Sequence, residues 1–198
     1  MSLRGFIGLA LIGGAGYIAY DIWRGGFDGL VSPPAGTDDG SGDGTDTGSA
    51  ITAPSQDYLD ALSKAEDPSG NPYAKNPYST ASGLFQFTKA TWVGLGGQWG
   101  SDDTQAFGGL TPSVDEQYAM AAKLTQQNAG ILDKLGIAIN NVSLYAAHIF
   151  GPSKAAPILG ADPSTSLAAV TSPHIVATNP ALGTTVQSFF NYLNAKVG

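Results

Sequence analysis

The sequence predicts a mostly α-helical domain behind an N-terminal membrane segment and a flexible linker. Apolar residues recur at helical spacing in several stretches, helix-capping residues precede some of them, and no stretch alternates convincingly between polar and apolar residues over strand length. With 198 residues, the chain has room for one domain of moderate size plus appendages. We therefore expect three parts, at residues 1–24, 25–54 and 55–198.

Residues 5–20 form an uncharged and largely apolar run, close to the lower limit of ~17 residues for crossing a bilayer. Tyr17, Tyr20 and Trp23 suit the aromatic belt at a membrane surface. We expect a retained transmembrane anchor, with the lipid bilayer as a partner. A cleaved signal peptide is the alternative, although no convincing cleavage site follows.

Residues 25–54 are rich in Gly, Asp, Ser, Thr and Pro and have no periodic apolar pattern. Such a segment cannot bury enough surface to offset the entropy that ordering removes. The spacing of Asp39, Ser41 and Asp43 is similar to a calcium loop, but Ala50 stands where an EF-hand needs a glutamate. We interpret the segment as a flexible acidic tether.

The composition excludes several functions. The net charge is −7 and there is no basic footprint, so we expect no nucleic-acid partner. The absence of cysteine excludes disulfides and thiolate metal sites. The two histidines, His148 and His174, lie far apart in the sequence, and we expect neither a metal site nor a cofactor.

The domain begins with a helix that Ser55 can cap, that continues to about Ala65 and that Pro68 ends. Residues 71–82 contain two prolines and several small polar residues, which indicates an ordered coil that shapes one wall of a cleft. Thr88 then caps a short helix. This part of the chain is predicted to hold its shape through turns rather than regular elements.

Residues 94–109 are rich in glycine and form a predicted lobe, in which we assign Trp99 and Phe107 to the local core rather than to sugar stacking. Thr111 or Ser113 caps a long helix after it. Its expected buried side contains Val114, Tyr118, Ala121, Leu124, Ile131, Leu132 and Leu135.

Two further helices complete the expected domain. Residues 142–150 form a strongly apolar helix. The last helix is indicated by apolar residues at positions i, i+3, i+4, i+7 and i+11, namely Val186, Phe189, Phe190, Leu193 and Val197.

Glu66 is the candidate catalytic acid. It shares a helical face with Tyr58 and Leu62 and stands at a helix C-terminus, where the helix dipole opposes a negative charge. Burial raises the pKa of a carboxyl, and an acid protonated near neutral pH can protonate the leaving group of a glycosidic bond. The second glutamate of the chain, Glu116, has a structural role beside Ser113 in the first turn of the long helix.

Three segments of the domain form a set. The first is Glu66 with Asn71-Pro72 and Lys75. The second is Ala81-Ser82-Gly83-Leu84-Phe85-Gln86. The third is Ala146-Ala147-His148-Ile149-Phe150-Gly151-Pro152. Together they resemble the soluble-lytic-transglycosylase family, and in particular virion-associated phage transglycosylases, with His148 where the family usually has tyrosine. The resemblance covers the chain outside its N-terminal quarter and implies a lysozyme-like fold.

The resemblance also implies a reaction. In this family one glutamate cleaves the β-1,4 bond between MurNAc and GlcNAc in peptidoglycan, first as acid and then as base toward the C6 hydroxyl, which gives 1,6-anhydro ends. Glu66 would be that residue. The matching positions make substrate-binding candidates of Ser82, Gly83, Phe85, Gln86, Tyr145 and His148.

The role of His148 depends on its charge. A neutral imidazole can donate the hydrogen bond that the family's tyrosine gives to the glutamate, whereas a protonated one would lower the pKa of Glu66. Tyr145, one turn earlier, offers a substitute hydroxyl. Gln86 is expected to bind substrate or to orient Glu66, and Phe85 is expected to belong to the core and the floor.

Two other functions stay open. A hydrolytic muramidase on the same fold would use a second carboxylate, for which Asp102 and Asp103 are the candidates. A structural glycan-binding virion protein would have little activity. In either phage or bacterium we expect membrane anchoring, in a virion internal membrane or in the inner membrane facing the periplasm, with other virion membrane or vertex proteins as further partners.

Overall fold

The computed structural model describes residues 53–198, and these are mostly helical, as the sequence predicts. The helices, in chain order, are α2 (Gln56–Glu66), α3 (Lys89–Gly94), η1 (Ala106–Gly109), α4 (Val114–Lys134), α5 (Asn141–Phe150), α6 (Pro152–Leu159), α7 (Leu167–Val170), α8 (Pro173–Thr178), η2 (Pro180–Leu182) and α9 (Val186–Val197). Between residues 53 and 198 the extended backbone forms isolated bridges and no strand.

The predicted membrane anchor at residues 1–24 and nearly all of the predicted linker lie outside the described residues. Within residues 53–198, every helix is too short or too polar to cross a bilayer.

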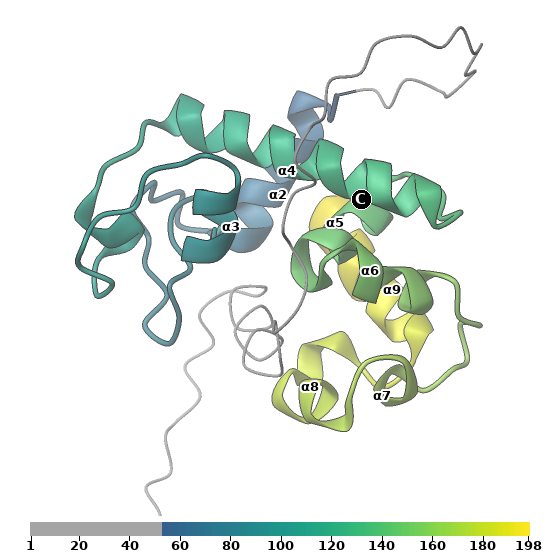
Figure 1. Ribbon diagram of the computed structural model, residues 1–198. Helices are drawn as coiled ribbons and strands as arrows, with labels where there is room; N and C mark the ends of the chain where they lie inside the picture. The colour runs from purple at the N-terminus through teal and green to yellow at the C-terminus, as the bar shows by residue number, and fades with distance from the viewer. Residues whose placement is uncertain (1–52) are drawn as a thin grey trace, which may run out of the picture.

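The long helix α4 runs along the whole domain (Figure 1). The loops around α3 lie under one half of it, and α5, α6 and α9 lie under the other half. Helix α2 lies between the two halves and packs against both α4 and α9. The C-terminal end of α2, which carries Glu66, is therefore enclosed by elements that are distant in sequence.

Each predicted N-cap of the first half is confirmed. Ser55 accepts a hydrogen bond from the backbone of Tyr58, and Thr88 accepts one from the backbone of Thr91. For α4 the cap is Ser113, which leaves Thr111 outside the helix. An N-cap of this kind contributes about 1 kcal/mol, because it satisfies a backbone N–H that has no partner in the first helical turn.

A chain of aromatic rings holds the loops around α3. The rings of Phe87 and Trp92 are 5.2 Å apart, and those of Trp92 and Phe107 are 4.8 Å apart. Phe107 is fully buried, and Trp99 packs against it at 5.8 Å, which confirms their assignment to the core of the lobe. Aromatic pairs at these distances stabilise the lobe beyond the area that they bury.

The predicted buried side of α4 is wrong in part. Ala121 and Leu132 are buried, but Val114, Ile131 and Leu135 are 44%, 41% and 49% exposed. The helix buries polar side chains as well, namely Gln117, Thr125 and Asn128. Loop backbone lies beneath the first turns of α4, and its buried N–H and C=O groups need hydrogen-bond partners, which Gln117 provides.

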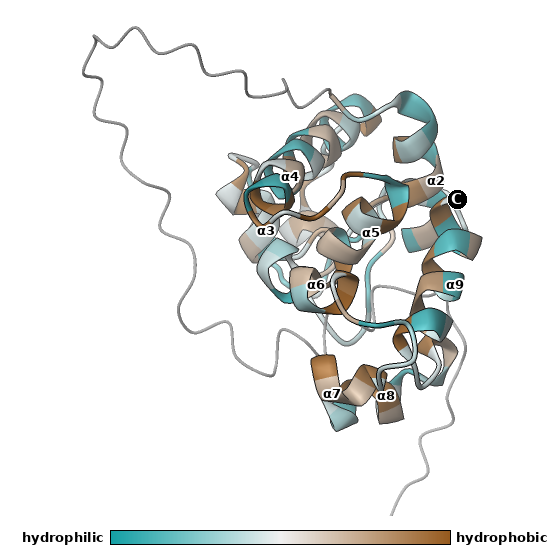
Figure 2. Cartoon of the chain, turned by 90° about the vertical axis from the view of Figure 1, so that its right-hand side faces the viewer, coloured by the Kyte–Doolittle hydropathy of each residue, from teal (hydrophilic) through white to brown (hydrophobic). Residues whose placement is uncertain are grey.

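The second half of the domain confirms both predicted helices. In α9 the buried residues are Val186, Phe189, Leu193 and Val197, with Phe190 partly buried. Between α5 and α9 the chain forms the short helices α6, α7 and α8, which the sequence analysis did not identify. Hydrophobic residues on α7 and α8 lie at one end of the domain (Figure 2).

Candidate active site

Glu66 is the last residue of α2, and its side chain is 2% exposed. Tyr58 and Leu62 are also buried, which confirms that the three residues share the inner face of the helix. Burial raises the pKa of Glu66 to about 8, against smaller opposing effects from Tyr145 and Lys196. The carboxyl is therefore mostly protonated at neutral pH, as the sequence analysis predicts for a catalytic acid.

His148 faces Glu66 from α5. Its Nε2 atom is 3.8 Å from Glu66 Oε1, and its side chain is 11% exposed. Burial lowers the pKa of His148 to about 4, so the imidazole is neutral at neutral pH. The pair is thus a contact between two uncharged groups. The distance exceeds that of a hydrogen bond, and the direct donation expected from the imidazole is not formed.

Tyr145 also faces Glu66 from α5. Burial, and secondarily the charge of an ionised Glu66, raise the pKa of the Tyr145 hydroxyl, and this hydroxyl in turn lowers the pKa of Glu66. Among the described residues, neither Tyr145 OH nor Glu66 Oε1 has a hydrogen-bond partner of normal geometry. The two groups therefore interact through space, and both retain hydrogen-bonding capacity.

Helix α9 contributes two residues that the sequence analysis missed. Tyr192 lies close enough to Tyr145 and Glu66 for its own pKa to be raised, mainly by burial and then by the charge of Glu66. Lys196 lowers the pKa of Glu66, and its Nζ atom lies 5.8 Å from the centre of the Tyr192 ring. The sequence indicates only that Tyr192 and Lys196 share one face of the last helix, because they are four residues apart.

The segment from Ser82 to Phe87 forms a tight turn. Ser82 and Phe87 exchange two backbone hydrogen bonds, of 3.0 and 2.9 Å, across its base. Gly83 and Gln86 adopt positive φ angles of 76° and 47°, and the Gln86 side chain donates a hydrogen bond to the Gly83 carbonyl at 2.9 Å. A positive φ is rare for a residue other than glycine. The side-chain hydrogen bond of Gln86 therefore helps to hold the turn in this conformation.

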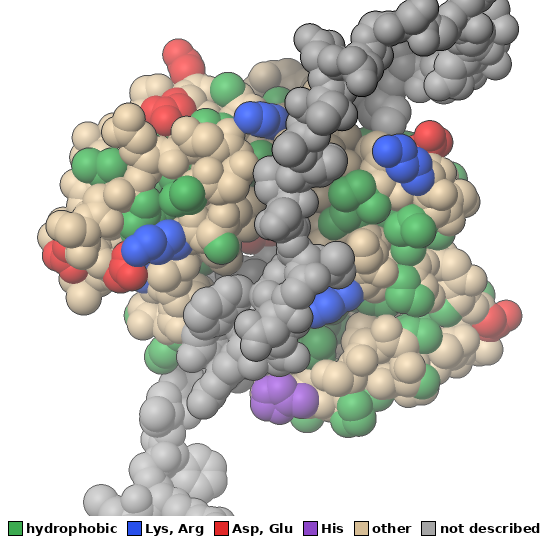
Figure 3. All heavy atoms as spheres, viewed as in Figure 1, with side chains coloured by type: hydrophobic (Ala, Val, Ile, Leu, Met, Phe, Trp, Pro, Cys, Tyr) green, Lys and Arg blue, Asp and Glu red, His purple; other side chains and the backbone are tan. Residues whose placement is uncertain are grey.

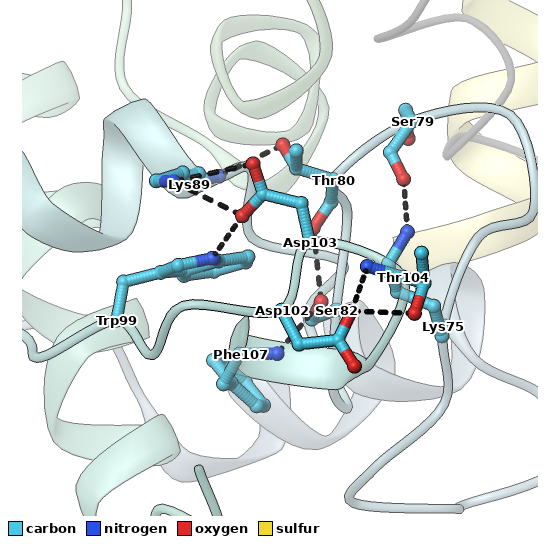
Figure 4. A network of polar contacts seen from close by, with 10 residues as sticks. All are labelled: Lys75, Ser79, Thr80, Ser82, Lys89, Trp99, Asp102, Asp103, Thr104 and Phe107. Carbon is cyan, nitrogen blue, oxygen red and sulfur yellow. Dashed lines mark hydrogen bonds and ion pairs between the residues drawn. The ribbon is translucent and has the colours of Figure 1, made fainter. Parts of the chain in front are cut away.

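The other turn candidates face the interior. The Ser82 hydroxyl donates to the Thr80 carbonyl and accepts from the backbone of Phe107 (Figure 4). Phe85 is fully buried, with its ring 4.9 Å from that of Tyr118. The side chains of Ser82 and Phe85 thus stabilise the turn, and their binding of substrate stays a prediction.

The turn is joined to the acid through His148, because the imidazole also interacts with the backbone of Phe85. Three segments that are distant in sequence therefore meet at one place: the end of α2 with Glu66, the turn with Phe85, and α5 with Tyr145 and His148.

The remaining candidate carboxylates are engaged elsewhere. Asp103 accepts hydrogen bonds from Lys89 at 3.0 Å and from Trp99 at 2.8 Å (Figure 4), and Asp102 accepts them from Thr104 and Gln105. Both aspartates have pKa values below the ordinary range because of these hydrogen bonds. Both are ionised, and their hydrogen bonds stabilise the lobe.

Asp67, next to Glu66, binds the loop that follows α2. Its carboxylate accepts hydrogen bonds from the Ser69 hydroxyl at 2.6 Å and from the Asn71 backbone at 2.7 Å, which orders the start of the loop. The Lys75 amine holds the same loop through the carbonyls of Asn76 and Ser79. Both observations confirm that residues 71–82 form an ordered coil.

Within residues 53–198, no cluster of histidine, aspartate and glutamate could hold a metal ion. On the face shown in Figure 3, basic and acidic side chains are scattered and form no basic patch. An open pocket of about 790 Å³, lined by Asn140, Phe190 and neighbouring residues, includes no residue of α2 or of the turn. No protein-family model matches the chain, and no curated protein matches it significantly.

Proposed function

We propose that the chain is a peptidoglycan lytic transglycosylase with a lysozyme-like helical domain, in which Glu66 is the acid and the base. The observation that carries the proposal is the state of Glu66: a carboxyl buried at a helix end, with a pKa of about 8, beside a neutral imidazole. A carboxylic acid that keeps its proton at neutral pH is the group that glycosidic cleavage requires.

In the first step Glu66 gives its proton to the glycosidic oxygen as the bond from C1 of MurNAc to that oxygen breaks. The leaving GlcNAc departs with a hydroxyl group. His148 supports this step by staying neutral, because a positive charge 3.8 Å from Glu66 would stabilise the carboxylate and weaken the acid. Glu66 Oε1 has no hydrogen-bond partner among the described residues, so no protein group competes for the proton of the acid.

In the second step the Glu66 carboxylate takes the proton of the C6 hydroxyl of the same MurNAc. The C6 oxygen then bonds to C1 and closes the 1,6-anhydro ring, so Glu66 is again protonated and no water is consumed. The burial that raises the pKa also makes the carboxylate a strong base once it has formed. The Tyr145 hydroxyl beside it can stabilise the negative charge between the two steps.

The carboxylates favour this route over hydrolysis. A two-carboxylate muramidase needs a second acidic group that faces the sugar opposite the general acid. Asp67 orders its own loop, and Asp102 and Asp103 are bound within the lobe. Glu66, in contrast, is buried and has a pKa of about 8, which keeps it mostly protonated at neutral pH.

From the resemblance to virion-associated enzymes, we further propose that the chain acts on the cell wall at phage entry and is anchored by residues 1–24 in a virion membrane. An enzyme anchored in the bacterial inner membrane and facing the periplasm is the alternative setting. In both settings the substrate is the glycan strand of peptidoglycan.

The test is the chemistry of the product. Purified sacculi are digested with the full-length chain, with Glu66→Gln and with Glu116→Gln, which changes the other, exposed glutamate. We expect 1,6-anhydro muropeptides from the wild type and from Glu116→Gln, and a loss of about 100- to 10,000-fold in Glu66→Gln. Mass spectrometry separates anhydro ends from hydrated ones. Reducing ends would replace the proposal with a muramidase, and glycan binding without turnover would favour a structural protein.

A further inference from the structure

Gln117 places a fully buried amide in the first turns of α4. On the same helix Val114 is 44% exposed, so this part of α4 buries a polar side chain while an apolar one faces water. A buried amide costs free energy unless its donors and acceptor are satisfied. The position of Gln117 is therefore specified by hydrogen bonds and not by hydrophobic packing.

The Gln117 amide joins three segments of backbone. Its Oε1 atom accepts a hydrogen bond from the Leu84 N–H at 3.0 Å. Its Nε2 atom donates to the Pro72 carbonyl at 3.0 Å and to the Pro112 carbonyl at 3.3 Å. Leu84 lies in the tight turn and Pro72 lies in the loop that begins after Glu66, so one side chain fixes both loops to α4.

The turn fits closely against this amide. A Cβ atom built on Gly83 would lie 2.3 Å from Gln117 Oε1 and 2.6 Å from the ring of Phe107. The backbone of the turn therefore lies directly on the side chain of Gln117. The next residue after Leu84 is Phe85, whose backbone interacts with His148, and His148 faces Glu66.

We propose that Gln117 is a positioning residue of the Glu66 site, because its amide sets the place of the turn against which His148 is held. The inference rests on the proposed function for its catalytic meaning. Gln117 acts through the backbone of Leu84 and Phe85 and touches neither Glu66 nor the sugar. Its removal moves the turn away from His148 and admits water to the buried pair.

The test compares Gln117→Ala with Leu132→Ala in the full-length chain. Leu132 is fully buried near the other end of the same helix, so its variant reports the effect of lost stability alone. At a temperature where both variants are folded, we expect kcat on glycan strands to fall about 100-fold in Gln117→Ala with little change in KM, as for a small misplacement of a catalytic group. Leu132→Ala should keep the wild-type kcat.

A conservative variant adds a rescue. In Gln117→Glu the introduced carboxyl can still accept the hydrogen bond of Leu84, but it can donate to Pro72 only when it is protonated. We therefore expect its kcat, relative to wild type at each pH, to recover as the pH falls. A role in stability alone predicts a constant ratio wherever the variant is folded.

An NMR titration of His148 provides a readout that needs no activity. Because the chain has two histidines, His174 on α8 is the internal reference. In Gln117→Ala we expect the pKa of His148 to rise from about 4 toward its ordinary 6.5, since water enters, and no such change in Leu132→Ala. An unchanged kcat together with an unchanged titration would overturn the inference. If the wild type releases no muropeptide, the proposed function fails, and the titration still decides the role of Gln117.

Discussion

Glu66 Oε1 and His148 Nε2 lie 3.8 Å apart inside the domain, and at neutral pH neither group carries a charge. Burial acts in opposite directions on the two residues, raising the pKa of the acid and lowering that of the base. An acid–histidine contact that would be an ion pair in water is therefore a neutral pair here. Its state controls both the stability and the proposed chemistry of the protein.

The first prediction concerns the pH dependence of stability. In the folded protein Glu66 keeps its proton to about pH 8, whereas in the unfolded chain it loses it near 4.5. The folded state thus binds more protons between these values, and its stability falls as the pH rises through this window. Glutamine does not titrate, so the unfolding free energy of Glu66→Gln should not fall in this way. We expect the difference in unfolding free energy, Glu66→Gln minus wild type, to increase by on the order of 3 kcal/mol between pH 4.5 and 7.

His148 has the opposite effect. Its folded pKa of about 4 is below the unfolded value of 6.5, so its contribution to stability rises with pH between 4 and 6.5. In the wild type the two contributions oppose each other up to about pH 6.5, and above it the loss from Glu66 stands alone. Urea unfolding of wild type and Glu66→Gln at several pH values checks both windows. A difference between them that is independent of pH would contradict the buried acid.

The second prediction concerns Tyr145. Its hydroxyl lowers the pKa of Glu66, so Tyr145→Phe should raise that pKa and move the alkaline limb of the kcat/KM profile to higher pH. The activity at pH 7 should change less than about tenfold, because one such interaction contributes about 1 kcal/mol. Tyr73→Phe, at a tyrosine that is 41% exposed, is the matched control and should leave the limb in place. A limb that moves to lower pH would show that Tyr145 does not stabilise the carboxylate.

Local signals in the sequence predicted much of this arrangement. The caps at Ser55 and Thr88 and the apolar spacing of α9 were correct, because they depend on residues within one or two helical turns. The shared face of Tyr58 and Glu66 was correct for the same reason. Such features need no knowledge of tertiary packing.

Features that depend on tertiary contacts were missed. Lys196 approaches Glu66 only because α2 packs against α9, and the sequence does not reveal that contact. The buried side of α4 was misassigned at Val114, because the loops beneath the first turns of the helix select a polar partner, Gln117, instead. Hydrophobic periodicity identifies a helix well, but it finds the buried side only where the neighbouring element is apolar.

The third prediction separates the two glycosidase mechanisms. In the double variant Asp102→Asn, Asp103→Asn both carboxylates of the lobe become neutral amides of similar size. We expect the product to remain 1,6-anhydro and the rate to stay within about threefold of wild type, because an exposed ion pair such as Lys89–Asp103 contributes little. Muropeptide analysis of the double variant beside Glu66→Gln provides the check. A loss of activity as large as that of Glu66→Gln would identify a second essential carboxylate.

The fourth prediction uses two glycines with similar backbone angles. Gly70 and Gly83 have φ values of 65° and 76°, and alanine is strained at both. Around Gly70 a new Cβ would meet no atom within 4 Å, whereas at Gly83 it would lie 2.3 Å from Gln117 Oε1. Gly70→Ala should therefore cost about 1 kcal/mol of stability, from the backbone angle alone. Gly83→Ala should cost about 2–5 kcal/mol, because overpacking adds to that strain.

Urea unfolding of both glycine variants measures this difference in stability. The activity of both variants, measured under conditions where both are folded, shows whether the turn also affects the Glu66 site. Gly83→Ala displaces the turn whose Phe85 backbone interacts with His148, so its kcat should fall while that of Gly70→Ala stays near wild type. Equal losses of stability in the two variants would show that the turn does not lie on the Gln117 amide. The two measurements together thus test whether the close fit of Gly83 against the Gln117 amide is needed to position Glu66.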